Sequence, residues 1–269
     1  MLNETSLIEE MIEDLKKKVG DNLPSHFFQP HLWVETITEL RSSWETFYQV
    51  FVNEYLYPFV AEENSNIFNN DNREAYRMDI ENKNRIKSAT SIIDKITRTI
   101  DKQKIPFLRG YNSKNLREFI EDYMLKIDDI VRCRILCNYQ SDMDEIDKNL
   151  TTEFVKATTN SKITYCSEKR RDKRIEAGRS FEKGAHRAIH EYFQMERDGK
   201  IYYLEIQIMT FLQEAWDIKQ HLIYEKIRRK INTPKIQHIK DRFHILSGLL
   251  MIADEFADKT WKIYQKGGR

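Results

Sequence analysis

Glycine, proline and cysteine are scarce in this chain of 269 residues, which contains 8, 5 and 3 of them. No segment is rich enough in glycine, serine and proline to form a flexible linker, so a single compact unit is expected. Three cysteines at these spacings fit neither a disulfide framework nor a zinc site. We expect Cys133, Cys137 and Cys166 to be buried apolar side chains in a reducing compartment.

An excess of either charge is also missing, because 44 basic and 43 acidic residues leave a formal net charge of +1. No overall field favours nucleic acid or a membrane surface, so any basic site must be local. Acidic residues run through the apolar stripe of residues 1–20, which is untypical of a signal peptide. No run of about 18 apolar residues occurs that could span a bilayer. A cytoplasmic protein without membrane contact is predicted.

Helical periodicity is clear at both ends of the chain. Apolar residues recur at helical spacing over 7–19 and 33–51, which predicts an N-terminal helical hairpin. The Asn-rich segment 61–75 is polar and is predicted to be an internal boundary. Two C-terminal helices are predicted, over about 211–230 and 234–266.

Helices and strands alternate in the middle of the chain. Helices are predicted to begin at Ser88, whose hydroxyl could cap the first turn, at about residue 115 and at about Asp142. A hairpin turn is predicted at Asp198 and Gly199. Strands are predicted near 129–139, 153–166, 185–195 and 202–210. The predicted fold is α+β, with a mixed central β-sheet flanked by helices and helical extensions at both ends.

The strand predicted over 202–210 alternates, with Glu205 and Gln207 on one face and Ile206 and Ile208 on the other. A carboxylate in this position could accept a proton from an attacking hydroxyl or help to bind a metal ion. It could equally be one half of a salt-bridged face.

Two further groups could contact phosphate. Side chains in the segment RIKSATSIIDK converge near a predicted helix N-terminus: Arg85, Lys87, Ser91 and Lys95. Helix amides and cations together favour a polyphosphate, although solvated helix starts of this kind are common. Asp129, at the mouth of a predicted strand, could hold Mg²⁺ together with phosphate and water oxygens, or be an ordinary loop residue.

A loop rich in cations is predicted over 167–187. It could grip the phosphates of a nucleotide or of RNA, but four acidic residues dilute its charge and such loops are usually solvated. Its cations are Lys169, Arg170, Arg171, Lys173, Arg174, Arg179, Lys183 and Arg187.

The order of these segments resembles the synthetase domain of the RelA/SpoT alarmone synthetases. That family carries an Arg-x-Lys segment followed by Ser and Lys, then Asp-x-x-Gly-x-Arg, then Gly-Tyr-Arg-x-x-His, then Glu-Ile-Gln-Ile-Arg-Thr followed by Gln, Trp and His. The corresponding stretches here read RIKSATSIIDK, DIVRCR, HRAIH and EIQIMTFLQEAWDIKQH. The resemblance covers about residues 75 to 250. It implies a nucleotidyltransferase-like fold divided into a helical extension (1–70), a synthetase domain (71–232) and a C-terminal helix packed on that domain (233–269).

The resemblance implies transfer of the β,γ-pyrophosphate of ATP to a ribose 3′-hydroxyl, with release of AMP. It makes Glu205 and Asp129 the catalytic residues and the ligands of Mg²⁺, with Glu205 activating or orienting the acceptor hydroxyl. The implied ATP-binding residues are Arg85, Lys87, Ser91, Lys95 and Arg134. The implied acceptor-binding residues are Lys183, His186, Arg187, His190 and Gln207. Trp216 and His221 are expected to brace the site from the following helix.

The sequence departs from the family pattern at three positions. Arg132 stands where the family usually has Gly, and Met209 stands where it usually has Arg, which removes a cation from the predicted active face. Alignment on His190 puts His186 in place of the Tyr that stacks on the acceptor guanine. Alignment on Gly184 instead puts Ala185 there and requires an insertion. The residues implied to bind ATP match the family pattern, whereas the identity of the acceptor is left undecided.

Several functions fit this resemblance. A small, synthetase-only member is expected, because no His-Asp hydrolase motif precedes the synthetase segment and no long regulatory region follows it. Such a protein could make (p)ppGpp or an adenosine counterpart. A toxin-type member would instead place pyrophosphate on the 3′-terminal adenosine of tRNA, with an antitoxin protein as partner. A third reading is a catalytically inactive module that binds a nucleotide or a protein partner.

Overall fold

The computed structural model describes residues 4–19, 23–71, 73–78, 85–102, 115–174, 187–227 and 234–267. The described residues fall into two compact units. Unit 1 draws on Met1–Val52, Asn82–Arg132 and Met195–Leu204, and unit 2 draws on Asn53–Glu81, Cys133–Gln194 and Glu205–Arg269. The segments 1–70, 71–232 and 233–269 stay a prediction, since the units are defined by compactness and not by order along the chain.

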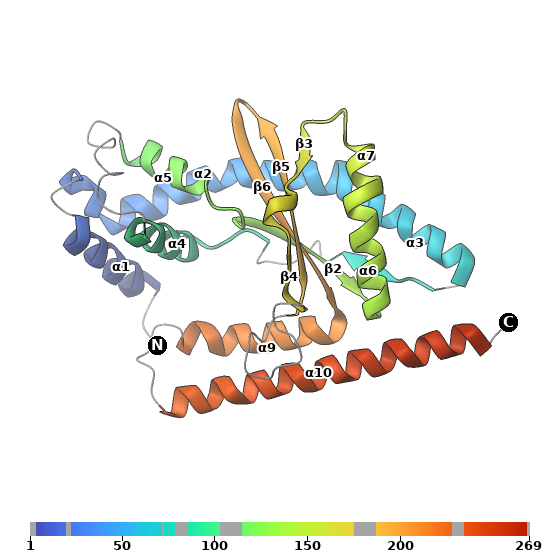
Figure 1. Cartoon of the computed structure of the whole chain (residues 1–269). Helices are drawn as coiled ribbons and strands as arrows, with labels where there is room; N and C mark the ends of the chain where they lie inside the picture. Colours follow the sequence, from blue (N-terminus) through green and yellow to red (C-terminus); the bar gives the residue numbers. More distant parts are fainter. Residues whose placement is uncertain are drawn as a thin grey trace. The chain divides into compact units, whose positions relative to one another are not determined.

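Unit 1 is mainly helical. Its helices are α1 (Glu4–Val19), a 3₁₀ turn (Ser25–Phe28), α2 (Pro30–Val50), α4 (Ala89–Lys102) and α5 (Leu116–Met124). Contacts join α2 to α1, α4 and α5, and α1 to α4 (Figure 1). The core is aromatic, and the ring centre of Phe119 lies 5.2 Å from that of Phe27 and 5.9 Å from that of Trp33. The predicted N-terminal helices and the burial of their aromatic stripe are confirmed.

The helices of unit 2 come from three separate parts of the chain. They are α3 (Tyr57–Asp71), α6 (Gln140–Asn149), a π-helical turn (Leu150–Phe154), α7 (Val155–Ala157), a 3₁₀ turn (Ser167–Lys169), α9 (Phe211–Ile227) and α10 (Pro234–Gly267). The long helix α10 runs alongside α9 and also contacts α6 (Figure 1). The two predicted C-terminal helices are therefore confirmed.

The predicted boundary at 61–75 is wrong for residues 61–71, which continue α3 after a π-helical segment (Phe51–Leu56). The polar composition misled because Asn64 has tertiary partners. Its Oδ1 accepts hydrogen bonds from the amides of Ala75 and Tyr76, at 3.1 and 2.9 Å. Burial of Val60 and Ile67 then holds the helix in place.

The strand predicted near 153–166 is present only as β3 (Ile163–Tyr165), and the residues before it are helical. Threonine favours strands, but here the hydroxyl of Thr158 donates to the carbonyl of Phe154, one turn earlier, at 2.9 Å. The Phe154 ring packs 5.2 Å from Phe59 and 5.3 Å from Phe193. Aromatic packing therefore outweighs the local preference.

One mixed sheet is formed by strands in the order β1-β2-β6-β5-β3, with β4 paired to β5. The strands are β1 (Tyr76–Met78), β2 (Val131–Cys137), β3, β4 (Arg171–Asp172), β5 (Ile189–Arg197) and β6 (Lys200–Thr210). β1 runs antiparallel to β2, with Tyr76 opposite Cys137. Asp198 and Gly199 have φ values of 52° and 72°, as the predicted hairpin turn requires. The predicted α+β fold is confirmed.

The expectation of a single compact unit is corrected by the division into two. The strands β2, β5 and β6 each contribute residues to both units. Three of the places where the chain passes between the units therefore lie within regular strands, and composition gives no signal of them.

Two smaller expectations concern cysteine and membranes. Cys133, Cys137 and Cys166 are buried and form no disulfide, as predicted. Within the described part of the chain, no helix combines the length and the apolar character needed to cross a bilayer.

A buried ion pair in unit 2 ties the segment before β1 to the start of α6. Arg73 donates to Asp142 through both terminal nitrogens, at 3.0 and 2.7 Å. Burial raises the pKa of Asp142, against the lowering effect of Arg73. The Arg73 guanidinium also lies 5.6 Å from the ring centre of Tyr139 and 4.9 Å from that of Trp261, two rings that stack on each other. One cation therefore holds three segments of the unit.

Replacing Arg73 by Ala is expected to cost roughly 3–5 kcal/mol of folding stability, because the Asp142 carboxylate would be left buried without a counter-charge, with the amide of Tyr139 still donating to it. Arg117→Ala is the matched control, because Arg117 and its partner Glu39 are more than half exposed. That variant should cost less than about 1 kcal/mol. Urea unfolding of both variants measures the difference, and equal losses would contradict the assignment.

Candidate active site

The segment predicted to bind ATP is extended before α4 and helical within it, and it lies in unit 1. Ile86 forms a bridge to Val131, and the amide of Lys87 donates to the carbonyl of Ile130 at 2.9 Å. Ser88 caps α4 as predicted, since its Oγ accepts a hydrogen bond from the amide of Ser91 at 3.2 Å. The backbone at the start of β2 therefore fixes where the cations of this segment begin.

Both predicted ATP-binding lysines pair with Asp129, the predicted metal ligand. Lys87 Nζ lies 3.2 Å from Asp129 Oδ2, and Lys95 Nζ bonds Asp129 Oδ1. The Arg85 guanidinium lies over the ring of Tyr48, 5.2 Å from its centre. Unit 1 thus brings Lys87, Lys95 and Asp129 together, as the sequence predicted, but as an ion-paired cluster.

The charge of Lys87 is weakened by its surroundings. Burial lowers its pKa, and the cations of Arg132 and Lys95 lower it further, while Asp129 acts in the opposite direction. Arg132 is the residue that stands where the resembled family usually has Gly. A departure in the sequence therefore acts on the electrostatics of the predicted ATP-binding group.

In unit 2, the Glu205 carboxylate is buried and held by several polar side chains. His190 Nδ1 lies 2.6 Å from Glu205 Oε1, and the hydroxyl of Tyr192 donates to the same oxygen at 2.8 Å. Gln207 Nε2 donates to Oε2 at 3.1 Å. The side chain of Glu205 is only 6% exposed. These contacts fix the orientation of a carboxylate that the alternation of β6 had singled out.

Arg134 contacts this group through Gln207. Its Nε donates to Gln207 Oε1 at 3.3 Å, and its Nη2 bonds Asp217 on α9. A second carboxylate of α9, that of Glu214, lies 3.8 Å from Nη1. Arg134 was predicted to bind ATP, and the structure places it as the link between Gln207 and α9.

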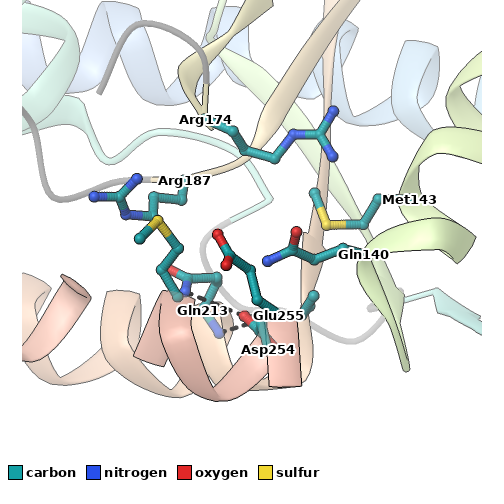
Figure 2. Close-up of a pocket in the computed structure, with 9 residues that line it drawn as sticks. Gln140, Met143, Arg174, Arg187, Gln213, Asp254 and Glu255 are labelled. Atoms are coloured by element: carbon teal, nitrogen blue, oxygen red, sulfur yellow. Dashed lines mark hydrogen bonds between the residues drawn. The ribbon is translucent and has the colours of Figure 1, made fainter. Parts of the chain in front are cut away.

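The acceptor residues predicted from the resemblance are only partly described. Lys183 and His186 lie outside the described residues. His190 and Gln207 contact Glu205, as described above. Arg187 is 4% exposed and its Nε donates to Ser247 Oγ at 3.3 Å. It lines a cavity of about 220 Å³, with Arg174, Gln213, Asp254 and Glu255 among the other lining residues (Figure 2).

The cationic loop is less available than its composition suggests. Arg170 lies 2.7 Å from carboxylate oxygens of both Asp147 and Glu191. Arg174 pairs with Asp172 at 2.8 Å and with Asp144 at 2.9 Å. These cations are used inside unit 2, where Asp172 comes from the loop itself and the tertiary fold supplies Asp144, Asp147 and Glu191 from outside it.

Few of the described side chains are placed to bind a metal ion. In the described ranges, no group of three or more His, Cys, Asp or Glu side chains is placed to hold a metal ion. Mg²⁺ commonly uses only one or two carboxylates, with substrate phosphates and water completing its octahedron. The Asp129 side chain, 24% exposed, is a single carboxylate of this kind, and it would have to be released by both lysines before it could hold a metal ion.

Sequence reasoning missed Tyr192, Glu214 and Asp217. Tyr192 could have been found, because it follows His190 by two residues on a strand and therefore shares its face. The carboxylates of α9 gave no such signal, since nothing in the sequence relates them to Arg134. Trp216 is buried and its Nε1 donates to the carbonyl of Phe243 at 3.1 Å, so it secures α10. The side chain of His221 lies outside the described part.

Comparison with known proteins identifies the fold. No protein-family model and no curated protein matches the sequence. Small alarmone synthetase 1 from Bacillus subtilis matches with 16% identity and a TM-score of 0.52, over 84% of this chain and 99% of that one. The same protein bound to AMPCPP matches with 19% identity and a TM-score of 0.52, again over 84% and 99%. Bound to its product pppGpp, it matches with 16% identity and a TM-score of 0.51 over the same shares.

These matches define the structural class of the chain. It has the fold of the small alarmone synthetases, the RelA/SpoT type that the order of its motifs predicted.

Proposed function

We propose that this protein is a pyrophosphotransferase that moves the β,γ-pyrophosphate of ATP to a hydroxyl of a nucleotide. The observation that carries the proposal is the buried Glu205 carboxylate, with His190, Tyr192 and Gln207 around it. A carboxylate fixed in this way is oriented before the acceptor arrives, which is what a general base requires. The small alarmone synthetase fold supports this reaction class.

In the proposed reaction, the acceptor hydroxyl attacks the β-phosphorus of ATP. A bond forms between the acceptor oxygen and the β-phosphorus, and the bond from the β-phosphorus to the oxygen that bridges to the α-phosphorus breaks. AMP leaves with that oxygen, and the hydroxyl proton passes to Glu205. Gln207, held by Arg134, keeps the carboxylate in place, so Arg134 acts as a positioning residue.

The ATP phosphates are assigned to the cations of unit 1. Lys87 and Lys95 would exchange Asp129 for phosphate oxygens, and Arg85 and the Ser91 hydroxyl would add further contacts. Asp129, released from the lysines, would hold Mg²⁺, which supplies positive charge to the phosphates when it is bound. The ion pairs of the cluster support this assignment, because they keep both cations and the carboxylate in one place before ATP arrives.

A small nucleotide is the proposed acceptor. The internal pairing of Arg170 and Arg174 leaves fewer cations for the phosphate backbone of an RNA. The fold match to a synthetase bound to AMPCPP and to pppGpp points in the same direction. Transfer to the 3′ end of tRNA, with an antitoxin as partner, is the competing outcome of the test below. Mg²⁺ as cofactor and a cytoplasmic location are parts of the same proposal.

The test is incubation of the protein with γ-³²P-labelled ATP and Mg²⁺, offering GDP, GTP, AMP, ADP and bulk tRNA separately. We expect label to move to a small nucleotide and AMP to appear in equal amount. Label in tRNA that is lost when its 3′ end is oxidised would replace the nucleotide by tRNA as acceptor. ATP binding without AMP under all conditions would overturn the proposal and favour an inactive binding module.

A further inference from the structure

Helix α10 buries polar side chains and exposes apolar ones, the reverse of an ordinary surface helix. Its buried residues include Ser247, Asp254 and Asp258. Asp254 Oδ2 accepts hydrogen bonds from Thr210 at 2.7 Å and from Gln213 at 3.3 Å. Polar contacts of this kind, together with Trp261 stacked on Tyr139, hold the helix on the rest of unit 2, so its exposed apolar side chains are not needed for that purpose.

The opposite face carries a row of large apolar side chains. We name it the α10 stripe, and it consists of Ile245, Leu249, Ile252, Phe256 and Ile263, which are 51%, 56%, 51%, 74% and 71% exposed. Single exposed apolar residues are normal, but five in a row on one helix mark an interaction surface. The spacings of four, three, four and seven residues are those of the a and d positions of a heptad repeat. The stripe is therefore shaped to pack against another helix.

We propose that the α10 stripe binds the α10 stripe of a second copy of this chain, with the two helices antiparallel. Four of its residues, Ile245, Leu249, Ile252 and Phe256, lie symmetrically about a point between Leu249 and Ile252, and Ile263 lies outside this symmetric part. Antiparallel pairing about that point sets Leu249 against Ile252 of the second copy and Ile245 against Phe256, each twice. A surface that complements itself about one point is what a two-fold interface requires.

Charge decides between antiparallel and parallel pairing. Asp241 and Lys262 occupy equivalent positions beside the stripe, at its two ends. Antiparallel pairing brings each of them next to the opposite charge of the second copy, whereas in-register parallel pairing brings neither pair together. Lys262 bonds Asp258 within its own helix at 2.6 Å, but its side chain is still 51% exposed.

Charged side chains also limit the length of the apolar contact between the two helices. Arg242 and Lys259 fall at stripe positions and would face each other across the antiparallel pair. Their long side chains can extend into solvent, but they add no apolar area. Four apolar layers lie between these two like-charged layers, so a dimer that dissociates on dilution is expected and not a permanent assembly.

The first test is sedimentation of the full chain over a wide range of concentrations. We expect dimers that dissociate on dilution, and Leu249→Glu should weaken dimerisation by about tenfold or more, since it places a charge in the central layer. Ile218→Glu is the matched control, because Ile218 on α9 is 53% exposed and lies outside the stripe. A chain that is monomeric at every concentration, or a dimer that both variants weaken equally, would overturn the proposal.

The second test reads the orientation. Asp241→Lys and Lys262→Asp should each weaken the dimer, and the variant that carries both should restore it. In oxidising conditions, a mixture of Leu249→Cys and Ile252→Cys chains should form a disulfide between the two kinds of chain, while either kind alone should not. The three native thiols are buried and do not obscure the result. Disulfides within each variant alone would show parallel pairing and refute the antiparallel arrangement.

Discussion

Replacing Glu205 by Gln is expected to reduce pyrophosphate transfer by about 10²–10⁴-fold while leaving the fold intact. Gln keeps the size of the side chain and one oxygen that can accept from Tyr192, but it cannot take the hydroxyl proton. Because ATP is assigned to residues of unit 1, the affinity for ATP should change little. Single-turnover transfer of label from ATP and equilibrium binding of ATP separate the two effects.

Glu191→Gln is the matched control for that experiment. Glu191 is a buried carboxyl on β5, next to His190 in sequence but on the other face of the strand, where Tyr165 donates to it at 2.7 Å. Burial and Asp147 raise its pKa, while Arg170, 2.7 Å away, opposes the shift, and none of these groups contacts Glu205. Its variant should therefore keep near-native transfer. If Glu205→Gln were as active as Glu191→Gln, Glu205 would not be the base.

The pH dependence of stability gives the control its own readout. The pKa of Glu191 is higher in the folded protein than in the unfolded chain, where it has the ordinary value of 4.5. Between these two pKa values the folded protein holds a proton that the unfolded chain has already released. Stability from this group is therefore full below about pH 4.5 and is lost as the pH rises through about 8. Glu191→Gln should flatten this part of the stability profile without changing transfer.

Replacing Lys87 by Met is expected to lower kcat/KM for ATP by roughly 30-fold to several thousand-fold, which corresponds to about 2–5 kcal/mol for removing one partner of a desolvated charge pair. Asp129 would also lose one of its two cations. Lys200→Met is the matched control, because Lys200 forms an ion pair with Glu121 near the surface of the same unit. It should leave kcat/KM unchanged.

The pH profile tests the electrostatic part of this assignment. Burial, Arg132 and Lys95 lower the pKa of Lys87, and only its charged form attracts phosphate. As the pH rises through that lowered pKa, kcat/KM should fall, and it should do so at a lower pH than an unperturbed lysine would give. Lys87→Arg should move this fall to higher pH, because the guanidinium stays charged. If Lys87→Arg left the pH profile of kcat/KM unchanged, Lys87 would not be an ATP-binding residue.

Several features could be predicted because they depend on neighbours in the chain. The cap at Ser88 and the turn at Asp198 and Gly199 are matters of a few residues each. The alternation that singled out Glu205 is equally local, since side chains on a strand change face at every residue. The order of motifs then indicated the fold, which the solved structures match.

Other features depended on partners that are remote in sequence. Helix α3 continues through an Asn-rich segment because Asn64 bonds the backbone beside β1. Arg134, predicted from the sequence as an ATP-binding residue, also bonds Asp217 of α9, a contact that the sequence does not indicate. The same is true of Arg170 and Arg174, whose carboxylate partners include residues of α6.

The sequence by itself determined most of the elements, the fold class and the residue types that carry the proposed chemistry, because periodicity, caps and turns are set by short-range geometry. The tertiary structure alone decided which charges are paired, which are buried and which face of α10 is left exposed. A helical pattern shows that one side is apolar, but not which side is buried. For α10, Thr210, Gln213 and Ser141 bind its acidic side chains, so the polar face is held against unit 2 and the apolar stripe is exposed.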